Sequence, residues 1–293
     1  MRNAEPVTAA RTATSIYIAS PEGDTGKSTV ALGILHRLTA TVPRVGVFRP
    51  ITRREDRDYI LELLLAHSNA GLAYEDCVGV SYQQLHEDPE AAIGDIVDRY
   101  HAMAARCDAV VIVGSDYTDV ATPTELSVNA RIAVNLGAPV VLSVRARDRT
   151  PVEVAQVIEL CLAELAAQHA HTAAVVANRC EPAQMAVVAE ACKDLGPHVY
   201  VLPEEPLLVA PTVADLCGAV DGTLVHGDES LLAREVMGGR MGGGFAVLEG
   251  GEWDAKAKLT DETEEGDGVE CAVVTLEAEV SGITIACLYL PNG

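Results

Sequence analysis

Aromatic side chains are scarce in this chain of 293 residues, of which Phe, Tyr and Trp make up only 4%. A core with so few large rings has to be filled by smaller aliphatic side chains, and hydrophobic residues account for 49% of the sequence. Runs rich in Val, Ile and Ala suit a parallel sheet that is buried on both faces and closely covered by helices. The length favours about two domains.

Basic residues are also few, because the chain has 21 Lys and Arg against 43 Asp and Glu, for a net charge of −22. Such a surface repels nucleic acid and anionic membranes, so we expect neither as a partner. An anionic small molecule is the expected ligand, and it needs a local binding site. All apolar runs fall short of the roughly 20 residues of a membrane span. The first residues lack the apolar core of a secretory signal.

Paired cysteines are absent as well. None of the eight cysteines belongs to a Cys-x-x-Cys motif, which argues against a zinc site. Most of them lie in apolar segments, as the reduced thiols of a cytoplasmic protein do. We therefore expect buried free thiols and a cytoplasmic location.

The most informative stretch is residues 15–30. Ser15–Ala19 is an apolar run typical of a buried strand, residues 20–26 form a turn-prone loop, and a helix is predicted from Lys27 onward. The backbone amides of such a loop and the positive end of the helix dipole bind phosphate groups. The candidate anion contacts are Gly23, Thr25, Gly26, Lys27 and Ser28.

In this arrangement Lys27 reaches the terminal phosphates and Ser28 offers its hydroxyl to a magnesium ion. ATP, or another phosphate-bearing ligand with magnesium, is therefore the expected cofactor. Pro21 stands where the usual motif has a glycine, and proline removes one amide donor from the loop. A plain strand–turn–helix connection that binds nothing is the alternative.

Two further predicted strands are followed by residues with possible roles in binding. Arg49 ends the predicted strand Arg44–Arg49, and Asp116 follows the predicted strand Asp108–Val113. Ligands of open α/β folds bind at the carboxyl ends of the strands, so Arg49 is a secondary anion candidate. Asp116 is a candidate magnesium ligand. Capping of the helix that begins near Thr122 is the equally open alternative for it.

Predicted strands and helices alternate along most of the chain. This alternation predicts an α/β fold with a doubly wound parallel sheet and a P-loop-type first unit, followed by a small, poorly packed β-containing tail. Residues 70–80 are expected to be irregular. The expected organisation is a disordered lead (1–14), a P-loop domain (15–220), the start of a truncated middle domain (221–237), a glycine-rich and acidic linker (238–268) and a β-hairpin tail (269–293).

Several separated stretches carry a family resemblance. They are Ile16–Ser20, Gly23–Ser28, Val47–Ile51, Val111–Asp119, Pro123–Leu126 and Val175–Arg179. Together they resemble the N-terminal domain of the long form of bacterial phosphate acetyltransferase. That domain is in turn similar to dethiobiotin synthetase, a P-loop enzyme that makes a carbamate–phosphate anhydride from ATP.

The resemblance implies a regulatory and assembly domain of a homo-oligomeric enzyme that transfers acetyl groups reversibly between CoA and phosphate. The acetyl-transfer domain has no counterpart in these 293 residues, so no catalytic residue is expected here. Glu22 falls where the synthetase has a metal-binding aspartate, which makes it a candidate metal ligand. Gly114 stands where the synthetase has a glutamate, so ATP turnover is not expected.

Other functions fit parts of the pattern. Lys27 and Ser28 would also serve an active ATP-dependent ligase of the dethiobiotin synthetase type, and the acidic surface would suit a non-catalytic scaffold that binds proteins. Residues 272–293, which end in Leu-Tyr-Leu-Pro-Asn-Gly, are similar to an internal hairpin of the endonuclease–exonuclease–phosphatase superfamily. The metal ligands of that superfamily have no counterpart here, so nuclease activity is not predicted.

Overall fold

The computed structural model describes most of the first two hundred residues and selected segments after them. The described residues are 13–53, 57–115, 125–205, 208, 211–219, 223–224, 229–234, 236, 238–242, 245–249, 257–264, 271–278 and 288–289. The chain divides into two compact units, Met1–Glu204 and Glu205–Gly293. The predicted disordered lead lies almost entirely outside the described residues, and so does Asp116.

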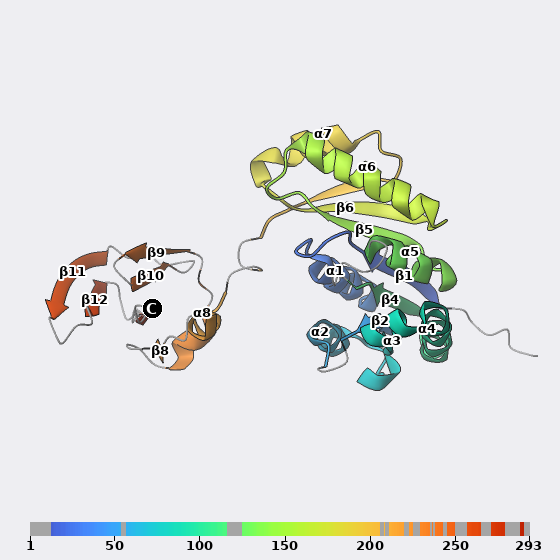
Figure 1. Ribbon diagram of the computed structural model, residues 1–293, viewed down its shortest axis with the longest axis horizontal. Coiled ribbons are helices and arrows are strands. Elements are labelled where there is room, and N and C mark those ends of the chain that lie inside the picture. Colours follow the sequence, from blue (N-terminus) through green and yellow to red (C-terminus); the bar gives the residue numbers. More distant parts are fainter. Residues whose placement is uncertain are drawn as a thin grey trace, which may run out of the picture. The chain divides into compact units, whose positions relative to one another are not determined.

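The first unit is built on a seven-stranded parallel sheet with the order β3-β2-β4-β1-β5-β6-β7 (Figure 1). The strands are β1 (Thr14–Ala19), β2 (Val45–Thr52), β3 (Val78–Ser81), β4 (Ala109–Val113), β5 (Val140–Arg145), β6 (Thr172–Cys180) and β7 (Val199–Pro203). The predicted α/β class with a parallel sheet is therefore confirmed.

Strand β1 occupies the middle of this sheet. It pairs with β4 on one side and with β5 on the other, so that Ile18 lies opposite Val113 and Val141. Tyr17, Ile18 and Ala19 have no exposed surface, because helices cover both faces of the strand. The loop that follows β1 therefore emerges at the centre of the carboxyl edge, where open α/β sheets bind ligands.

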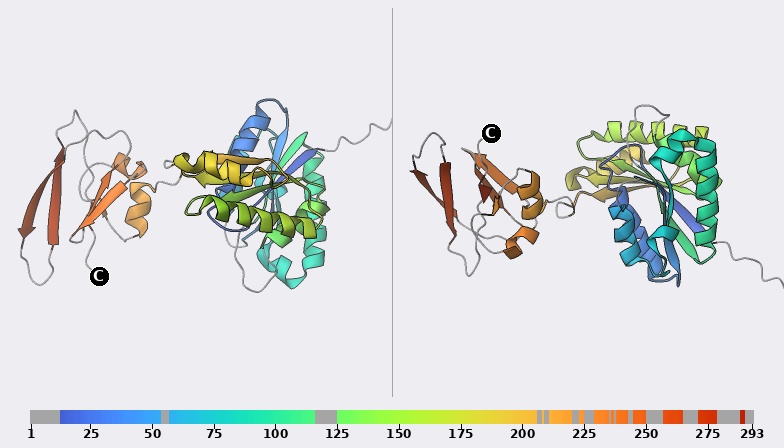
Figure 2. Two further views of the ribbon diagram at one scale, coloured as in Figure 1. Left: turned by 90° about the horizontal axis from the view of Figure 1, so that it is seen from above. Right: turned by 60° about the horizontal axis from the view of Figure 1, so that its bottom comes forward.

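Helices cover both faces of the sheet (Figure 2). Helices α4, α5, α6 and α7 form a row in which each contacts the next, and α1 contacts α2. The helices are α1 (Lys27–Thr39), α2 (Tyr59–His67), α3 (Tyr82–Glu87), α4 (Pro89–Ala104), α5 (Glu125–Asn135), α6 (Pro151–Ala167) and α7 (Met185–Cys192), with short 3-10 helices η1 (Tyr74–Asp76) and η2 (Pro182–Gln184). Within the described residues, none is long and apolar enough to cross a membrane.

Capping side chains set where several of these helices begin. Asp58 accepts a hydrogen bond from the amide of Leu61 at the start of α2, and Asp88 caps α4 just before a proline. Thr150 and Glu153 form a reciprocal capping box at the start of α6. Each cap satisfies an amide that has no partner within its own helix.

The sequence pattern did not predict one of the strands. Residues 70–80 were expected to be irregular, but β3 forms there and pairs with β2, with Val80 opposite Ile51. Only four residues make up this strand, which is too short for a period-two pattern to stand out. The position becomes a strand because β2 extends to Thr52 and presents an edge to it.

The described residues of the second unit, from Glu205 onward, include short strands and short helical segments. They are α8 (Val213–Ala219), β8 (Thr223–Leu224), the 3-10 helix η4 (Glu229–Ala233), β9 (Gly238–Gly242), β10 (Phe245–Glu249), β11 (Ala257–Glu264), β12 (Cys271–Ala278) and β13 (Leu288–Tyr289). Strands β8, β13, β10 and β9 form one sheet, and β11 pairs with β12 in another.

This unit differs from the sequence expectation in three respects. The first unit ends at Glu204 and not near residue 220. The segment just after it bonds to a later segment of the second unit, because the amide of Val213 donates to the carbonyl of Arg234 and the amide of Val236 donates to the carbonyl of Pro211. The expected linker 238–268 contains strands. The expected hairpin within 269–293 is replaced by pairing of β12 with the preceding β11 and of β13 with β10 and β8.

Candidate functional site

The loop between β1 and α1 takes a conformation that leaves amides of the first helical turn without a capping side chain. Gly26 is the N-cap of α1 with φ 72° and ψ 23°, and Asp24 also has a positive φ of 57°. Having no side chain, Gly26 makes no cap hydrogen bond, so amides at the start of α1 are not satisfied by one. A helix N-terminus in this condition favours a phosphate group.

Glycine is required at position 26 for two reasons. Its left-handed φ is costly for other residues. A Cβ atom placed there would also lie 2.2 Å from Nδ2 of Asn178, which approaches the loop from the end of β6. The glycine therefore permits the contact between the phosphate loop and β6.

Side chains of neighbouring strands donate hydrogen bonds to backbone carbonyls of the loop. Oγ of Ser143 on β5 donates to the carbonyl of Thr25 at 3.2 Å, and Nδ2 of Asn178 donates to the same carbonyl at 2.9 Å. Arg179 donates from Nη1 to the carbonyl of Asp24 at 2.8 Å. Because carbonyls accept these bonds, the contacts fix the loop without occupying its amides.

An ion pair joins the loop to the segment that follows β5. Nη1 and Nη2 of Arg149 donate to the two carboxylate oxygens of Glu22 at 2.6 and 3.0 Å. This bidentate hydrogen bond raises the pKa of Arg149. Burial acts in the opposite direction, but its effect is smaller. Glu22 was predicted as a metal ligand, and here both of its oxygens are bonded to a guanidinium group.

Lys27 and Arg49 converge on the end of β4. Nζ of Lys27, whose side chain is 2% exposed, donates to the carbonyl of Ser115 at 2.9 Å. Nη1 of Arg49 donates to the carbonyls of Val113 and Gly114 at 3.2 and 2.5 Å. The side chains of two predicted anion contacts thus bond to the carbonyls of three consecutive residues at the end of β4.

Arg49 also belongs to a buried ion pair. Its Nε lies 2.9 Å from Oδ2 of Asp58, and the two side chains are only 1% and 6% exposed. A buried pair of this kind neutralises both charges and stabilises the fold only while both partners are present. The role of Arg49 as an anion contact stays a prediction, because its bonds in the described residues are to protein atoms.

A buried hydrogen-bond network fixes the β4 end. Oδ1 of Asn129 on α5 accepts from the hydroxyl of Tyr17 at 2.7 Å and from the amide of Ser115 at 3.1 Å. Its Nδ2 donates to the carbonyls of Ser115 and Glu125 at 3.1 and 2.8 Å. Burial raises the pKa of Tyr17, so its hydroxyl stays protonated as a donor.

Gly114 lies directly under this network. A Cβ atom there would lie 2.3 Å from Oδ1 of Asn129 and 2.8 Å from Cε1 of Tyr17. The space that a longer side chain would need after β4 is therefore filled. Glycine therefore suits position 114, because Asn129 and Tyr17 leave no room there for a side chain.

These contacts bear on the magnesium ion that a P-loop implies. Magnesium prefers carboxylate, hydroxyl and water oxygens in octahedral geometry. Of the predicted ligands, Ser28 is half-buried at the start of α1, Glu22 is paired with Arg149, and Asp116 lies outside the described residues. No cluster of three metal-binding side chains occurs among the residues that were described. Of these candidates, Glu22 does not fit a magnesium ligand in this structure, because both of its oxygens bond to Arg149.

The remaining predicted contacts are placed as follows. Gly23 is exposed, with no atom within 4 Å of a Cβ position, and Thr25 is buried with its carbonyl bonded to Ser143 and Asn178. Gly23, Thr25, Gly26, Lys27 and Ser28 are contiguous, so the loop brings them together. Their role in anion binding stays a prediction. Within the described part of the chain, Oγ of Ser20 at the loop start is buried without a hydrogen-bond partner.

Sequence reasoning missed several residues that shape this edge. Arg149 reaches the loop from the segment after β5, Arg179 reaches it from the end of β6, and Asn129 fixes the β4 end. A signal existed for Arg179, because it lies at the carboxyl end of a Val-rich strand, as Arg49 does. No signal marked Asn129, since a single polar residue in a helix reads as a solvated position.

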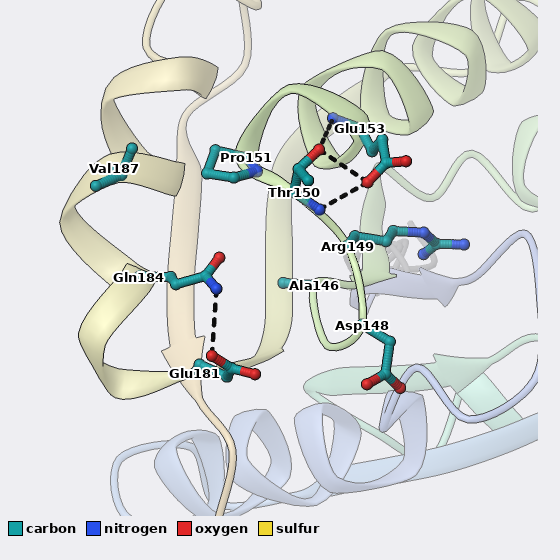
Figure 3. A pocket seen from close by; sticks show the side chains of 9 residues that line it. All are labelled: Ala146, Asp148, Arg149, Thr150, Pro151, Glu153, Glu181, Gln184 and Val187. Atoms are coloured by element: carbon teal, nitrogen blue, oxygen red, sulfur yellow. Dashed lines mark hydrogen bonds between the residues drawn. The ribbon is translucent and has the colours of Figure 1, made fainter.

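A cavity of about 500 Å³ opens beside this edge (Figure 3). Its walls come from the segment after β5, the start of α6 and the segment from Glu181 to Val187. Glu181 accepts a hydrogen bond from Gln184 at 3.2 Å on one wall. The guanidinium group of Arg149 extends away from Gln184 and Val187 in this view.

Glu204 provides a test of the electrostatics at this edge. Nε of Arg179 lies 3.0 Å from Glu204, and hydrogen bonds from Arg179 hold the pKa of Glu204 below its ordinary value. A carboxylate whose pKa is lowered in the folded state stabilises the fold at pH values above its unfolded-state pKa of about 4.3. This stabilisation is lost as the pH falls through the folded-state pKa. We expect the difference in unfolding free energy between wild type and Glu204→Gln to be constant above about pH 6 and to shrink in acid.

Urea denaturation at a series of pH values measures this difference. Glu159→Gln, at an exposed position on α6, controls for the loss of one carboxylate. A difference that is independent of pH would contradict the assignment of the stabilising pair to Glu204.

Comparison with known proteins places the site in a family. A family model described as an AAA domain matches residues 14–212, which is more than half of the chain. The chain belongs to this AAA domain family. The AAA domain spans the whole seven-stranded sheet and includes the loop between β1 and α1.

This chain is also similar in sequence to curated phosphate acetyltransferases. It is 29% identical over 229 residues to that of Nitratidesulfovibrio vulgaris, covering 73% of this chain and 32% of the relative. It is 28% identical over 178 residues to that of Synechocystis, covering 57% of this chain and 25% of the relative. The chain thus spans a third or less of these relatives. The matches confirm the resemblance to the N-terminal P-loop domain of long-form phosphate acetyltransferase.

Solved structures show similar arrangements at low identity. The cell division protein MinD of Aquifex aeolicus is 18% identical, with 67% of this chain and 85% of MinD covered at a TM-score of 0.44. The hydrogenase maturation factor HypB of Archaeoglobus fulgidus is 14% identical, with 66% and 81% covered at a TM-score of 0.39.

Proposed function

We propose that the AAA domain of this chain is the ligand-sensing and assembly segment of a phosphate acetyltransferase, and not its acetyl-transfer centre. Similarity to phosphate acetyltransferases supports the enzyme class. The ligand is a phosphate-bearing anion, bound by the loop from Gly23 to Ser28. In keeping with an assembly role, the protein is a homo-oligomer in the cytoplasm.

The observation that carries this proposal is the state of the β1–α1 loop. Its carbonyls are bonded to Ser143, Asn178 and Arg179, whereas the N-cap of α1 is a glycine that leaves amides available to an anion. Beside it, Asn129 and Tyr17 fill the space that a side chain at position 114 would need. A loop with available amides, whose acidic residue Glu22 is paired with Arg149, would suit binding of an anion without turnover.

Lys27→Ala is the variant that tests phosphate binding. We expect at least one of ATP, NADH, CoA and inorganic phosphate to raise the melting temperature of the wild type, because binding to the folded state alone stabilises it. Loss of the ammonium group removes a charge-assisted contact and is expected to weaken binding at least about tenfold. A thermal-shift titration measures both. Lys193→Ala, an exposed lysine after α7, is the matched control.

Three outcomes decide the proposal. A wild type that none of these compounds stabilises would contradict ligand sensing. Conversion of acetyl-CoA and phosphate to acetyl phosphate by the purified chain would contradict the non-catalytic role. ATP-dependent carboxylation of a diamine that is lost in Lys27→Ala would identify a ligase instead.

A further inference from the structure

Arg149 reaches the phosphate loop from outside it. The residue lies between β5 and α6, four residues after the end of β5, and its side chain is 20% exposed. Besides its two bonds to Glu22, Nη1 donates to the carbonyl of Arg145 at 2.7 Å. The backbone contact keeps the guanidinium group beside the loop independently of Glu22.

Glu22 lies on the open side of the loop. Its side chain is 31% exposed, and the neighbouring Gly23 is exposed with no atom within 4 Å of a Cβ position. An unpaired carboxylate at this place would repel a phosphate group. Ion pairs that water reaches contribute little to stability, so the partner of Arg149 is exchangeable.

We propose that Arg149 is a ligand contact of the phosphate loop, which bonds to Glu22 in this structure and transfers its two hydrogen bonds to the phosphoryl group of a bound anion. This inference rests on the proposed function, since it presumes that the loop binds phosphate. It deepens that function by naming the ligand class, which is a phosphate-bearing anion that is not complexed with a divalent metal.

The chemistry of the site favours an arginine over a metal ion. A guanidinium group donates two parallel hydrogen bonds, a geometry that matches phosphate oxygens as well as it matches a carboxylate. Glu22 holds the sequence position of the synthetase's metal ligand, and here it bonds to Arg149. At the end of β4, Asn129 and Tyr17 fill the space that a side chain at position 114 would need. Lys27 and Arg149 together supply the positive charge that magnesium would bring.

Isothermal titration with pyrophosphate, once with EDTA and once with excess magnesium chloride, tests the inference. Four variants are compared with the wild type, namely Arg149→Gln, Arg149→Lys, Glu22→Gln and Arg147→Gln. Arg147 is the matched control, because it lies in the same segment but pairs with Glu204 and Asp148. Thermal melting of every variant verifies that it is folded.

We expect the wild type to bind pyrophosphate in EDTA at least as tightly as in magnesium. Arg149→Gln should weaken binding about tenfold, since a charge-assisted pair of hydrogen bonds is lost, and Arg149→Lys should restore part of it. Glu22→Gln should tighten binding several-fold, because it removes both a competitor for Arg149 and a negative charge. Arg147→Gln should leave the affinity unchanged.

Glu22→Gln separates the two roles of the carboxylate. A metal ligand at this position predicts weaker binding in magnesium, whereas a competitor for Arg149 predicts tighter binding in EDTA. Binding that requires magnesium, or that is unchanged in both Arg149→Gln and Glu22→Gln, would overturn the inference while the proposed function stands. A wild type that binds neither pyrophosphate nor the panel of ligands above would instead overturn the proposed function.

Discussion

Replacing Gly114 by Glu, the residue type of the synthetase, is expected to destabilise the protein by about 3 kcal/mol or more and to create no magnesium site. The new Cβ would lie 2.3 Å from Oδ1 of Asn129 and 2.8 Å from the ring of Tyr17. Either Asn129 moves, and the bonds to Tyr17 and Ser115 break, or the backbone at the end of β4 shifts.

Urea denaturation of the variant measures this loss. Gly94→Ala is the matched control, because no atom lies within 4 Å of its Cβ position and the residue is exposed in α4. That substitution should stabilise the protein by about 0.5–1 kcal/mol through helix propensity. Equal stability of wild type and Gly114→Glu, with magnesium bound to the variant, would show that the space after β4 is open.

The second large effect is expected for Asp58→Ala. Asp58 pairs with Arg49 at 2.9 Å and accepts the amide of Leu61 at the start of α2. Its removal leaves a buried arginine without its carboxylate, which typically costs about 3–5 kcal/mol, and deletes a cap worth about 1 kcal/mol. We expect a loss of about 4 kcal/mol in the free energy of unfolding, measured by urea denaturation.

Asp88→Ala provides the comparison. Asp88 caps α4 through the amide of Ala91 at 3.1 Å, but it is exposed. Its loss should cost about 1 kcal/mol, the value of a cap alone. Similar losses in the two variants would mean that the Arg49–Asp58 pair adds nothing to stability.

Local features of the fold were predictable from the sequence. The Gly-Lys-Ser step after an apolar run located the phosphate loop, and Asp88-Pro89 marked the start of α4, since both signals lie within a few neighbouring residues. Seven strands alternate with helices much as the pattern indicated, except for β3. Four residues long, β3 forms because β2 offers it an edge, which no local pattern reveals.

The contacts that shape the candidate site were not predictable in the same way. Asn178 bonds to Thr25 across 153 positions of sequence, and Arg149 bonds to Glu22 across 127. Such pairs depend on the order and register of β1, β5 and β6, which a single sequence does not specify. Asn129 escaped notice because burial, and not residue type, makes it a partner of Tyr17 and Ser115.

The anchoring of the β1–α1 loop by β5 and β6 means that the proposed anion recognition would need the completed sheet. A fragment that stops before β5 contains the entire Gly-Lys-Ser signature and still lacks Ser143, Asn178 and Arg179, the three donors that shape the loop. A bound anion, in turn, would stabilise the contacts between the loop and strands that are far apart in the sequence. It would thereby oppose local unfolding of β6.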